Sequence, residues 1–349
     1  MQGRYILAIE SSCDETAVAI MENGTKILSS LVSSQIARHR PFGGVVPELA
    51  ARCHAEVINP IIDKALEEAG LKLKDLDAIA VTHGPGLIGA LLVGLAAAKA
   101  LAAALEIPLV AVNHLRSHVY SNFVTTLPSP SGEGLGLGGT EDSVKNLFVL
   151  PYLVLLVSGG HTQLIEMKSH TQLSILAETG DDAVGEAFDK VARLLQLGYP
   201  GGPAVQNAAA HGDPKKVRFN LSKDSDRFSF SGIKTAVLTY IKKHPETDAA
   251  DIAASFQASV IEALVHKTVA AAKERGIPRI MLCGGVAANT GLRAGLEAAC
   301  AENNFSFSVP PFALCTDNAA MVGCAAYFQL LSSGASSLEI EADPNLVLA

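Results

Sequence analysis

The stretch YILAIESSCDETAVAI, residues 5–20, decides the fold of this chain. It contains an apolar strand, a small polar turn and a second apolar strand. The same order returns about 147 positions later in LVLLVSGGHTQLI, residues 153–165. Such a hairpin points backbone N–H groups into its concave side, where phosphate oxygens can bind. A repeat at half the chain length predicts two related α/β lobes facing each other across a cleft; the alternative is chance similarity of two buried hairpins.

Strands and helices alternate outside the two hairpins. Three further apolar strands, at residues 77–82, 109–112 and 279–283, each lead through a turn or directly into a helix. This order is typical of α/β proteins, in which ligands gather at the carboxyl ends of the strands. The turns that follow these strands are therefore expected to converge on one site.

The composition sets limits on the kind of protein. The 349 residues suffice for two domains, and the formal net charge of −8 argues against binding nucleic acid through bulk electrostatics. An RNA substrate would need a local basic face or a basic partner. The six cysteines show no C-x-x-C spacing, which indicates reduced thiols in the cytoplasm. The first residues enter a strand at once, so we expect no signal peptide.

One apolar helix, beginning near Gly86, raises the question of a membrane span. Lys99 interrupts it after about 13 apolar residues, short of the roughly 20 that a span needs. We therefore predict a buried helix and no membrane contact.

Two histidines four residues apart, His114 and His118, are candidate metal ligands. Residues at this spacing project from one face of a helix, as in other H-x-x-x-H sites. Asp317 is a good candidate for a carboxylate that completes the site. Two imidazoles and one carboxylate leave coordination positions open, as a catalytic metal requires, and suit either iron or zinc. The alternative is a helix start with two surface histidines.

Several glycine-containing turns are candidates for nucleotide binding. Ser158-Gly159-Gly160 and Ser11-Ser12-Cys13 would form facing anion-binding hairpins. Asp189 lies inside a helix, which favours hydrogen bonds to ribose hydroxyls over a role at the helix start. Asn289 opens a helix after Gly284-Gly285, where its amide could bond a sugar or base. An ordinary tight turn is the alternative for each glycine pair, and no P-loop or Rossmann motif occurs.

These positions suggest a division of the chain. We predict an N-terminal lobe at residues 1–112 and a C-terminal lobe at 113–318 that carries the metal and nucleotide site. A C-terminal helix within 319–349 is expected to pack back on the first lobe. The Pro/Ser/Gly-rich segment within 127–146 cannot form a core, and we predict a flexible insertion there.

Together the motifs resemble one family, the tRNA N6-adenosine threonylcarbamoyltransferases known as TsaD or Gcp. The match is in order along nearly the whole chain, so it is highly specific. Its segments are residues 9–16, 43–48, 84–87, the two histidines, 157–162, 185–190, 200–203, 228–232, 284–289 and 315–318. The chain departs from the family in carrying Arg116-Ser117 between the histidines, where Glu-Gly is usual.

The resemblance implies the actin-like, Hsp70-like and sugar-kinase-like ATPase fold of two duplicated lobes with a cleft between them. It implies one divalent metal held by His114, His118 and Asp317. It also implies contacts to an adenylate nucleotide from Leu156, Val157, Ser158, Gly159, Gly160, Asp189, Gly202 and Asn289. Glu10 and Asp14 are candidates for the catalytic acid and base, although each could instead organise the metal or a phosphate.

The implied reaction transfers a threonylcarbamoyl group from threonylcarbamoyl-AMP to N6 of the adenosine 3′ to the anticodon of ANN-decoding tRNAs, releasing AMP. Expected partners are tRNA, an inactive paralogue of the same fold and a P-loop ATPase; a homodimer is compatible with the sequence. One alternative is a small-molecule kinase or ATPase of the same fold, which would hold Mg²⁺ through carboxylates and phosphates. A metalloprotease would need glutamate after the first histidine, where Leu115 stands. A non-catalytic partner subunit would be expected to lack the metal triad.

Overall fold

A computed structural model describes residues 3–127, 135–136, 149–221 and 227–348 of the chain. The chain forms two compact units. Unit 1 comprises Met1–Leu150, Lys168–Leu173 and Thr316–Ala349, and unit 2 comprises Pro151–Met167 and Ser174–Cys315. Most of the insertion predicted at 127–146 lies outside the described residues.

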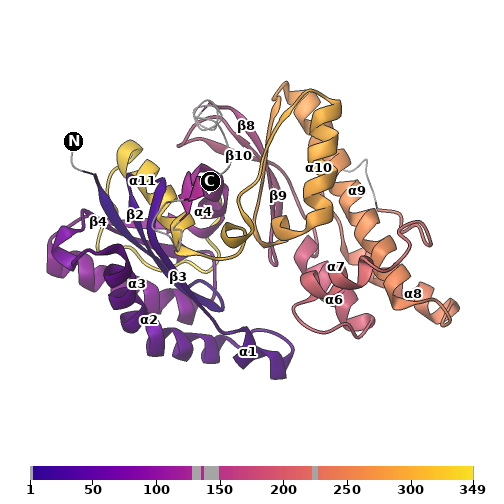
Figure 1. Cartoon of the computed structure of the whole chain (residues 1–349), viewed down its shortest axis with the longest axis horizontal. Coiled ribbons are helices and arrows are strands. Elements are labelled where there is room, and N and C mark those ends of the chain that lie inside the picture. The colour runs from indigo at the N-terminus through magenta and orange to yellow at the C-terminus, as the bar shows by residue number, and fades with distance from the viewer. Residues whose placement is uncertain (1–2, 128–134, 137–148, 222–226, 349) are drawn as a thin grey trace. The chain divides into compact units, whose positions relative to one another are not determined.

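Unit 1 is built on a sheet with strand order β5-β4-β1-β2-β3-β6-β7, of which β2, β3 and β4 are labelled in Figure 1. Its strands are β1 (Tyr5–Glu10), β2 (Glu15–Glu22), β3 (Lys26–Ser34), β4 (Ala78–Gly84), β5 (Leu109–Asn113), β6 (Thr126–Leu127) and β7 (Leu135–Gly136). Its helices are α1 (Ile36–His39), α2 (Pro47–Ala69), α3 (Ile88–Leu105), α4 (His114–Tyr120) and α11 (Ala319–Ser332). The sheet is mixed, since β1 is antiparallel to β2 but parallel to β4.

The central strands of this sheet are apolar on both faces because helices cover both. Leu7 and Ile9 of β1 belong to a core shared with α2 and α3. Ala8 points to the opposite face and lies against Gly323 of α11. The contact is close, because a Cβ added to Gly323 would lie 3.2 Å from the Cβ of Ala8. Successive side chains of one strand therefore contact different helix layers, which explains the nearly continuous apolar run in the sequence.

Helix α3 is long and apolar enough, by length and composition alone, to cross a membrane. In the structure it packs against α2 and β4. Ala90, Leu91, Gly94, Leu95 and Ala98 are buried there, whereas Leu92 is 52% exposed. The buried side of α3 thus forms part of the core of unit 1, as expected for the covering helix of an α/β sheet.

Unit 2 contains a smaller sheet with strand order β10-β9-β8-β11-β12. Its strands are β8 (Tyr152–Val157), β9 (Thr162–Met167), β10 (Leu173–Glu178, whose first residue belongs to unit 1), β11 (Arg279–Cys283) and β12 (Ser306–Ser308). Its helices are α6 (Val184–Leu194), α7 (Gly201–Ala209), α8 (Ser231–Lys243), α9 (Ala249–Arg275) and α10 (Thr290–Glu302). Side chains of β8 and β11 form one core with side chains of α6, α9 and α10.

The two sheets share one topology, which confirms the predicted duplication. The order β3-β2-β1-β4-β5 in unit 1 corresponds to β10-β9-β8-β11-β12 in unit 2. In each, the first strand pairs antiparallel with the second and parallel with the fourth. The turn between the first two strands spans Ser11–Asp14 in one unit and Ser158–His161 in the other.

The boundary between the units differs from the predicted one. The sequence placed it after Val112, with the histidine pair in the second lobe. In the structure unit 1 extends to Leu150 and contains both histidines, because α4 continues directly from β5 and packs against α11. The nucleotide candidates, from Leu156 to Asn289, all lie in unit 2.

Candidate functional site

The histidine pair lies on α4, a short helix that begins where β5 ends. Asn113 caps this helix: its Oδ1 accepts hydrogen bonds from the backbone N–H groups of Leu115 at 2.9 Å and Arg116 at 3.1 Å. The cap fixes the first turn, so His114 and His118 project from the same face. Asp317 directly precedes Asn318, whose Oδ1 caps α11 by accepting from the N–H of Met321.

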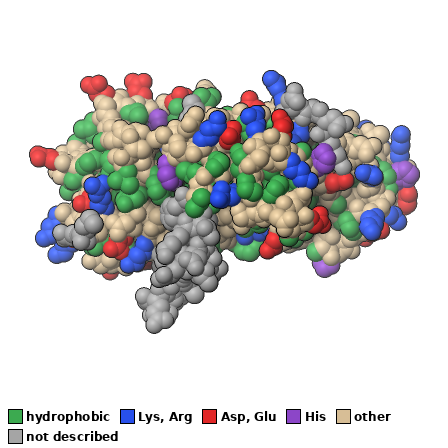
Figure 2. Space-filling model, turned by 90° about the horizontal axis from the view of Figure 1, so that it is seen from above, with side chains coloured by type: hydrophobic (Ala, Val, Ile, Leu, Met, Phe, Trp, Pro, Cys, Tyr) green, Lys and Arg blue, Asp and Glu red, His purple; other side chains and the backbone are tan. Residues whose placement is uncertain are grey.

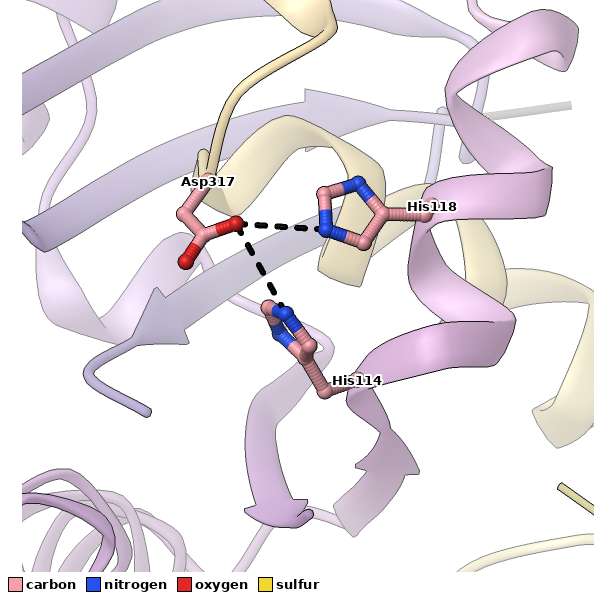
Figure 3. Close-up of side chains that lie close together, drawn as sticks. All are labelled: His114, His118 and Asp317. Atoms are coloured by element: carbon pink, nitrogen blue, oxygen red, sulfur yellow. Dashed lines mark ion pairs between the residues drawn. The ribbon is translucent and has the colours of Figure 1, made fainter. Parts of the chain in front are cut away.

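These two helix starts bring the three candidate ligands together (Figure 3). Asp317 Oδ1 lies 3.2 Å from Nε2 of His118 and 3.6 Å from Nε2 of His114. One ligand atom from each residue can be chosen so that all lie within 4.8 Å of one another. Two ligands held about 2.0–2.2 Å from one ion lie roughly 3–3.5 Å apart. The two distances from Asp317 Oδ1 to the histidine Nε2 atoms are close to this spacing, so the three residues could hold a single metal ion.

The ring nitrogens of His118, which lack hydrogen bonds to the described residues, support a role as a metal ligand. His118 is only 1% exposed, yet neither ring nitrogen has a hydrogen-bond partner of good geometry among the described residues. A buried polar atom without a partner is costly. Coordination of a metal by His118 would satisfy one of these nitrogens.

Glu10 orients the His114 ring through its Nδ1 atom, the ring nitrogen that does not face Asp317. Its carboxylate is fully buried, and Oε2 lies 3.0 Å from Nδ1 of His114. Thr82 Oγ1 donates to the same oxygen at 2.6 Å, and the N–H of Ser12 donates to Oε1 at 2.6 Å. With the Nδ1 proton directed to Glu10, the Nε2 lone pair of His114 is directed toward Asp317. A carboxylate behind a ligating histidine is a recurrent feature of metal sites.

The charges around the group favour an ionised carboxylate and a protonated histidine in the metal-free chain. Burial would lower the pKa of His114, but Asp317 and Glu10 outweigh it and raise that pKa to about 9. Burial would raise the pKa of Asp317, but His114 and His118 lower it to about 2. A metal ion that binds at neutral pH must therefore displace a proton from His114.

This displacement predicts a pH dependence of metal affinity. Below pH 9 one proton competes with the metal, so the apparent affinity for Zn²⁺ should fall about tenfold for each pH unit between 8 and 6. The Glu10→Gln substitution removes one of the carboxylates that hold the proton, so it should make this dependence shallower. It should also weaken binding at pH 8 by roughly 10- to 100-fold, because the ring loses its orienting partner.

Chelator competition at pH 6, 7 and 8 would measure both effects. Glu22→Gln is a suitable control. Glu22, at the end of β2, forms an ion pair with Lys26 at the start of β3, and it contacts none of the three candidate metal ligands. Equal slopes for the Glu10 variant and the control would show that Glu10 does not set the protonation of His114.

The other candidate for acid–base chemistry, Asp14, is the last residue of the β1–β2 turn, directly before Glu15 at the start of β2. Burial, followed by the charges of Asp14 and Asp317, raises the pKa of Glu15 to about 9. Glu15 is therefore protonated at neutral pH in the metal-free chain. In the sequence, the signal for Glu15 is its place directly after Asp14 in an acidic stretch.

The residues that depart from the family pattern have structural partners. The Arg116 guanidinium donates to the backbone carbonyl of His170 and lies 5.8 Å from the ring centroid of Tyr120. The His170 ring stacks on Phe328 of α11 with centroids 4.2 Å apart. Ser117 Oγ donates to the carbonyl of Asn113. Arg116 thus links α4 to the segment 168–173 of unit 1.

In unit 2, the Ser158–His161 turn closes tightly and leaves two backbone donors open. The N–H of Ser158 donates to the carbonyl of His161, and the N–H of His161 donates to Ser158 Oγ at 3.0 Å. The N–H groups of Gly159 and Gly160 make no hydrogen bond to another described residue. Both glycines are exposed, and a Cβ on either would meet nothing within 4 Å. The turn therefore has the open amides that an anion-binding hairpin needs.

Two glycines hold neighbouring backbone against this turn. An added Cβ on Gly185 would lie 2.6 Å from the carbonyl oxygen of Ser158, and one on Gly284 would lie 2.3 Å from that of Val157. Gly284 also has a φ of +92°. Gly285 is open, since a Cβ there would meet nothing within 4 Å. Of the two adjacent glycines, Gly284 is therefore required by packing, whereas Gly285 lies next to free space.

A chain of hydrogen bonds connects the remaining nucleotide candidates. Asp189 Oδ1 accepts from the N–H of Gly201 at 2.7 Å, next to the open position Gly202. Further along α7, Gln206 Oε1 accepts from the N–H of Thr290 at 2.8 Å. Asn289 caps α10 through its Oδ1 and donates to Gln257 Oε1 at 2.7 Å. The structure therefore links Asp189, in the middle of α6, to the start of α7 beside Gly202, and it links α7 to the start of α10 beside Asn289. It adds Gln206 and Gln257, which sequence reasoning missed.

Solved structures with a similar fold define the class of protein. HypF from T. kodakarensis matches 94% of this chain and 48% of its own length, with a TM-score of 0.63 and 16% identity. Component A of the (R)-2-hydroxyglutaryl-CoA dehydratase from Acidaminococcus fermentans matches 94% of this chain and 100% of its own, with a TM-score of 0.54 and 17% identity. The chain is a two-lobed α/β protein of the actin-like ATPase fold, which confirms the predicted fold class, and it carries a His/His/Asp group in its first unit.

Comparison with known sequences narrows this class to one family. The model of the TsaD family, described as tRNA N6-adenosine threonylcarbamoyltransferase, matches residues 26–324. The proteins of that name from Clostridium botulinum (strain Kyoto) and Moorella thermoacetica are 47% and 49% identical, over 98% of this chain and 97% of each relative. The one from Staphylococcus saprophyticus is 50% identical over 93% of this chain and 90% of its own. This chain belongs to the TsaD family, and the predicted resemblance is confirmed.

Proposed function

We propose that this chain transfers the threonylcarbamoyl group of threonylcarbamoyl-AMP to N6 of the adenosine 3′ to the anticodon in ANN-decoding tRNAs and releases AMP. The observation that carries the proposal is the convergence of His114, His118 and Asp317 in a chain of this family. The alternatives fit less well. A kinase of this fold would not need two imidazole ligands, and a zincin-type protease would need a glutamate where Leu115 stands.

The three residues would hold one divalent metal, with iron favoured and zinc compatible. When bound, the metal would act as a Lewis acid toward the carbamoyl oxygen of the donor. The contribution of the chain is to fix the ligands. Glu10 holds the Nδ1 side of His114, and the Asn113 and Asn318 caps hold the helices from which the ligands project.

The residues of unit 2 would bind the adenylate part of the donor. The open amides of Gly159 and Gly160 suit the phosphate, whose negative charge grows as AMP leaves. Asp189 in α6, Gly202 at the start of α7 and Asn289 at the start of α10 would contact the nucleoside, together with Leu156 and Val157 before the turn. Asn289 can take part without losing its cap, because the Oδ1 atom has a second lone pair and the amide a second proton.

The reaction is an acyl transfer. N6 of the adenosine forms a bond to the carbamoyl carbon, the bond from that carbon to the phosphate oxygen breaks, and AMP leaves with the electron pair. The exocyclic amine is a poor nucleophile, so positioning carries much of the catalysis. The N6 proton must pass to a base. Asp14 suits this role better than Glu10, because both carboxylate oxygens of Glu10 already accept hydrogen bonds inside the protein.

Recognition of tRNA would require partners. The net charge is −8, and Figure 2 shows Lys and Arg side chains intermixed with Asp and Glu on the visible face. A mixed surface attracts the phosphate backbone weakly. We therefore propose that an inactive paralogue of the same fold and a P-loop ATPase assist in the cytoplasm, and that the target adenosine is turned out of the anticodon loop.

The test is mass spectrometry of nucleosides from unmodified tRNA incubated with the chain, synthetic threonylcarbamoyl-AMP and the partner proteins. Threonylcarbamoyladenosine should appear with the wild-type chain. It should be absent when the donor is omitted or when His114→Ala replaces the wild type. No product, with the same partners and donor active beside another member of the family, would contradict the proposal.

A further inference from the structure

Arg293 of α10 is tied to two segments that belong to different parts of the proposed site. Its Nε donates to the carbonyl of Ala287 at 2.6 Å, within the turn that leads to Asn289. Its Nη2 donates to the carbonyl of Pro310 at 2.7 Å and to Sγ of Cys315 at 2.8 Å. The guanidinium also lies 4.0 Å from the ring centroid of Phe312. One rigid group therefore joins the turn at residues 284–289 to the loop at residues 310–315.

One of these segments ends at a residue of the proposed site, and the other ends two positions before one. The turn ends at Asn289, which caps α10 one helical turn before Arg293. The loop ends at Cys315, which is fully buried and precedes the metal-ligand candidate Asp317 by two positions. On its other side Asp317 is followed by Asn318, which is held by its cap on α11. Asp317 thus follows, by two positions, a residue that is bonded to Arg293, and it directly precedes the residue that caps α11.

We propose that Arg293 is a positioning residue that couples nucleotide binding to metal binding; this inference rests on the proposed function. A nucleotide that orders the 284–289 turn would order Arg293, and through Cys315 it would hold Asp317 in place for the metal. The planar fork of arginine suits this role because it can donate in two directions at once, which a lysine ammonium on a flexible chain does less well. Coupling of this kind is reciprocal, so the metal must strengthen nucleotide binding by the same factor.

The experiment measures this factor on the full chain with AMP and Zn²⁺ as probes. The affinity for Zn²⁺ is measured by chelator competition with and without saturating AMP, and the affinity for AMP is measured by calorimetry with and without Zn²⁺. In the wild type we expect each ligand to tighten the other by at least about fivefold, within the usual range of coupling. In Arg293→Ala the factor should fall to near one, and AMP affinity in the absence of Zn²⁺ should change by less than about threefold. Arg293→Lys should recover only part of the coupling.

Two further variants keep the test decisive. Cys315→Ala removes the acceptor next to Asp317 and keeps the arginine, so it should also lower the factor even if Arg293→Ala folds poorly. Arg275→Ala alters an exposed arginine at the end of α9 and should leave the factor unchanged. Binding of both probes with a factor of one in the wild type, or full coupling in both Arg293→Ala and Cys315→Ala, would overturn the inference and leave the proposed function intact. No binding of AMP or Zn²⁺ by the wild type would overturn both.

Discussion

The His118→Ala substitution is expected to abolish metal binding and threonylcarbamoyl transfer together. His118 is 1% exposed, and its Nε2 atom lies 3.2 Å from Asp317 Oδ1, so the substitution removes a buried candidate ligand from the group. Loss of one of three protein ligands should weaken Zn²⁺ or Fe²⁺ binding by roughly 100-fold or more, since loss of an outer partner alone costs 10- to 100-fold. Removal of Lewis-acid assistance worth several kcal/mol should slow transfer on the order of a thousandfold.

Metal content after dialysis and the yield of threonylcarbamoyladenosine would measure the two effects. His266→Ala is the matched control, because His266 is an exposed histidine on α9 and belongs to no candidate site. Both effects should be absent in the control. Retention of the metal with wild-type affinity by the His118 variant would remove this residue from the ligand set. Loss of the metal with full transfer activity would separate the metal from the chemistry.

The sequence predicted the duplicated fold because its signal is local. Each hairpin reads as two apolar runs around a four-residue turn, and backbone pairing then determines that β1 and β8 occupy the same place in their sheets. The histidine pair was equally accessible, since residues four apart share a helix face wherever the helix lies. Asp317 needed the family motif, because nothing in its local sequence determines that it meets α4.

The features that the sequence did not reveal depend on contacts between distant residues. Glu10 was a candidate catalytic group, but its hydrogen bond to Thr82 joins residues 72 apart, and only the fold shows that it orients His114. The unit boundary was misplaced for a similar reason, because α4 packs against α11, which lies near the other end of the chain. Gln257, which bonds Asn289, gave no signal at all, since a glutamine within a long helix usually faces solvent.

The Gly284→Ala substitution is expected to damage unit 2 at the point where β11 leaves the sheet. With a φ of +92° and a ψ of 168°, Gly284 adopts a backbone conformation that is essentially restricted to glycine. A Cβ there would also lie 2.3 Å from the carbonyl oxygen of Val157, directly before the anion-binding turn. The backbone strain costs about 1–3 kcal/mol, and displacing the packed strand costs about 1–3 kcal/mol more. The variant should therefore lose about 2–6 kcal/mol of unfolding free energy.

The same displacement should weaken AMP binding at least tenfold, because moving Val157 moves the amides of Gly159 and Gly160. Gly285→Ala is the matched control one residue away. Gly285 has no positive φ, and its added Cβ would meet nothing within 4 Å. Its unfolding free energy should stay the same or rise by up to about 1 kcal/mol, since alanine restricts the unfolded chain. Urea unfolding followed by circular dichroism and calorimetric titration with AMP would compare the two variants. Because the substitutions are chemically identical and adjacent, equal losses in both would mean that the contact of Gly284 with Val157 does not shape the nucleotide turn, whereas a loss confined to Gly284 would support the assignment of that turn to the phosphate.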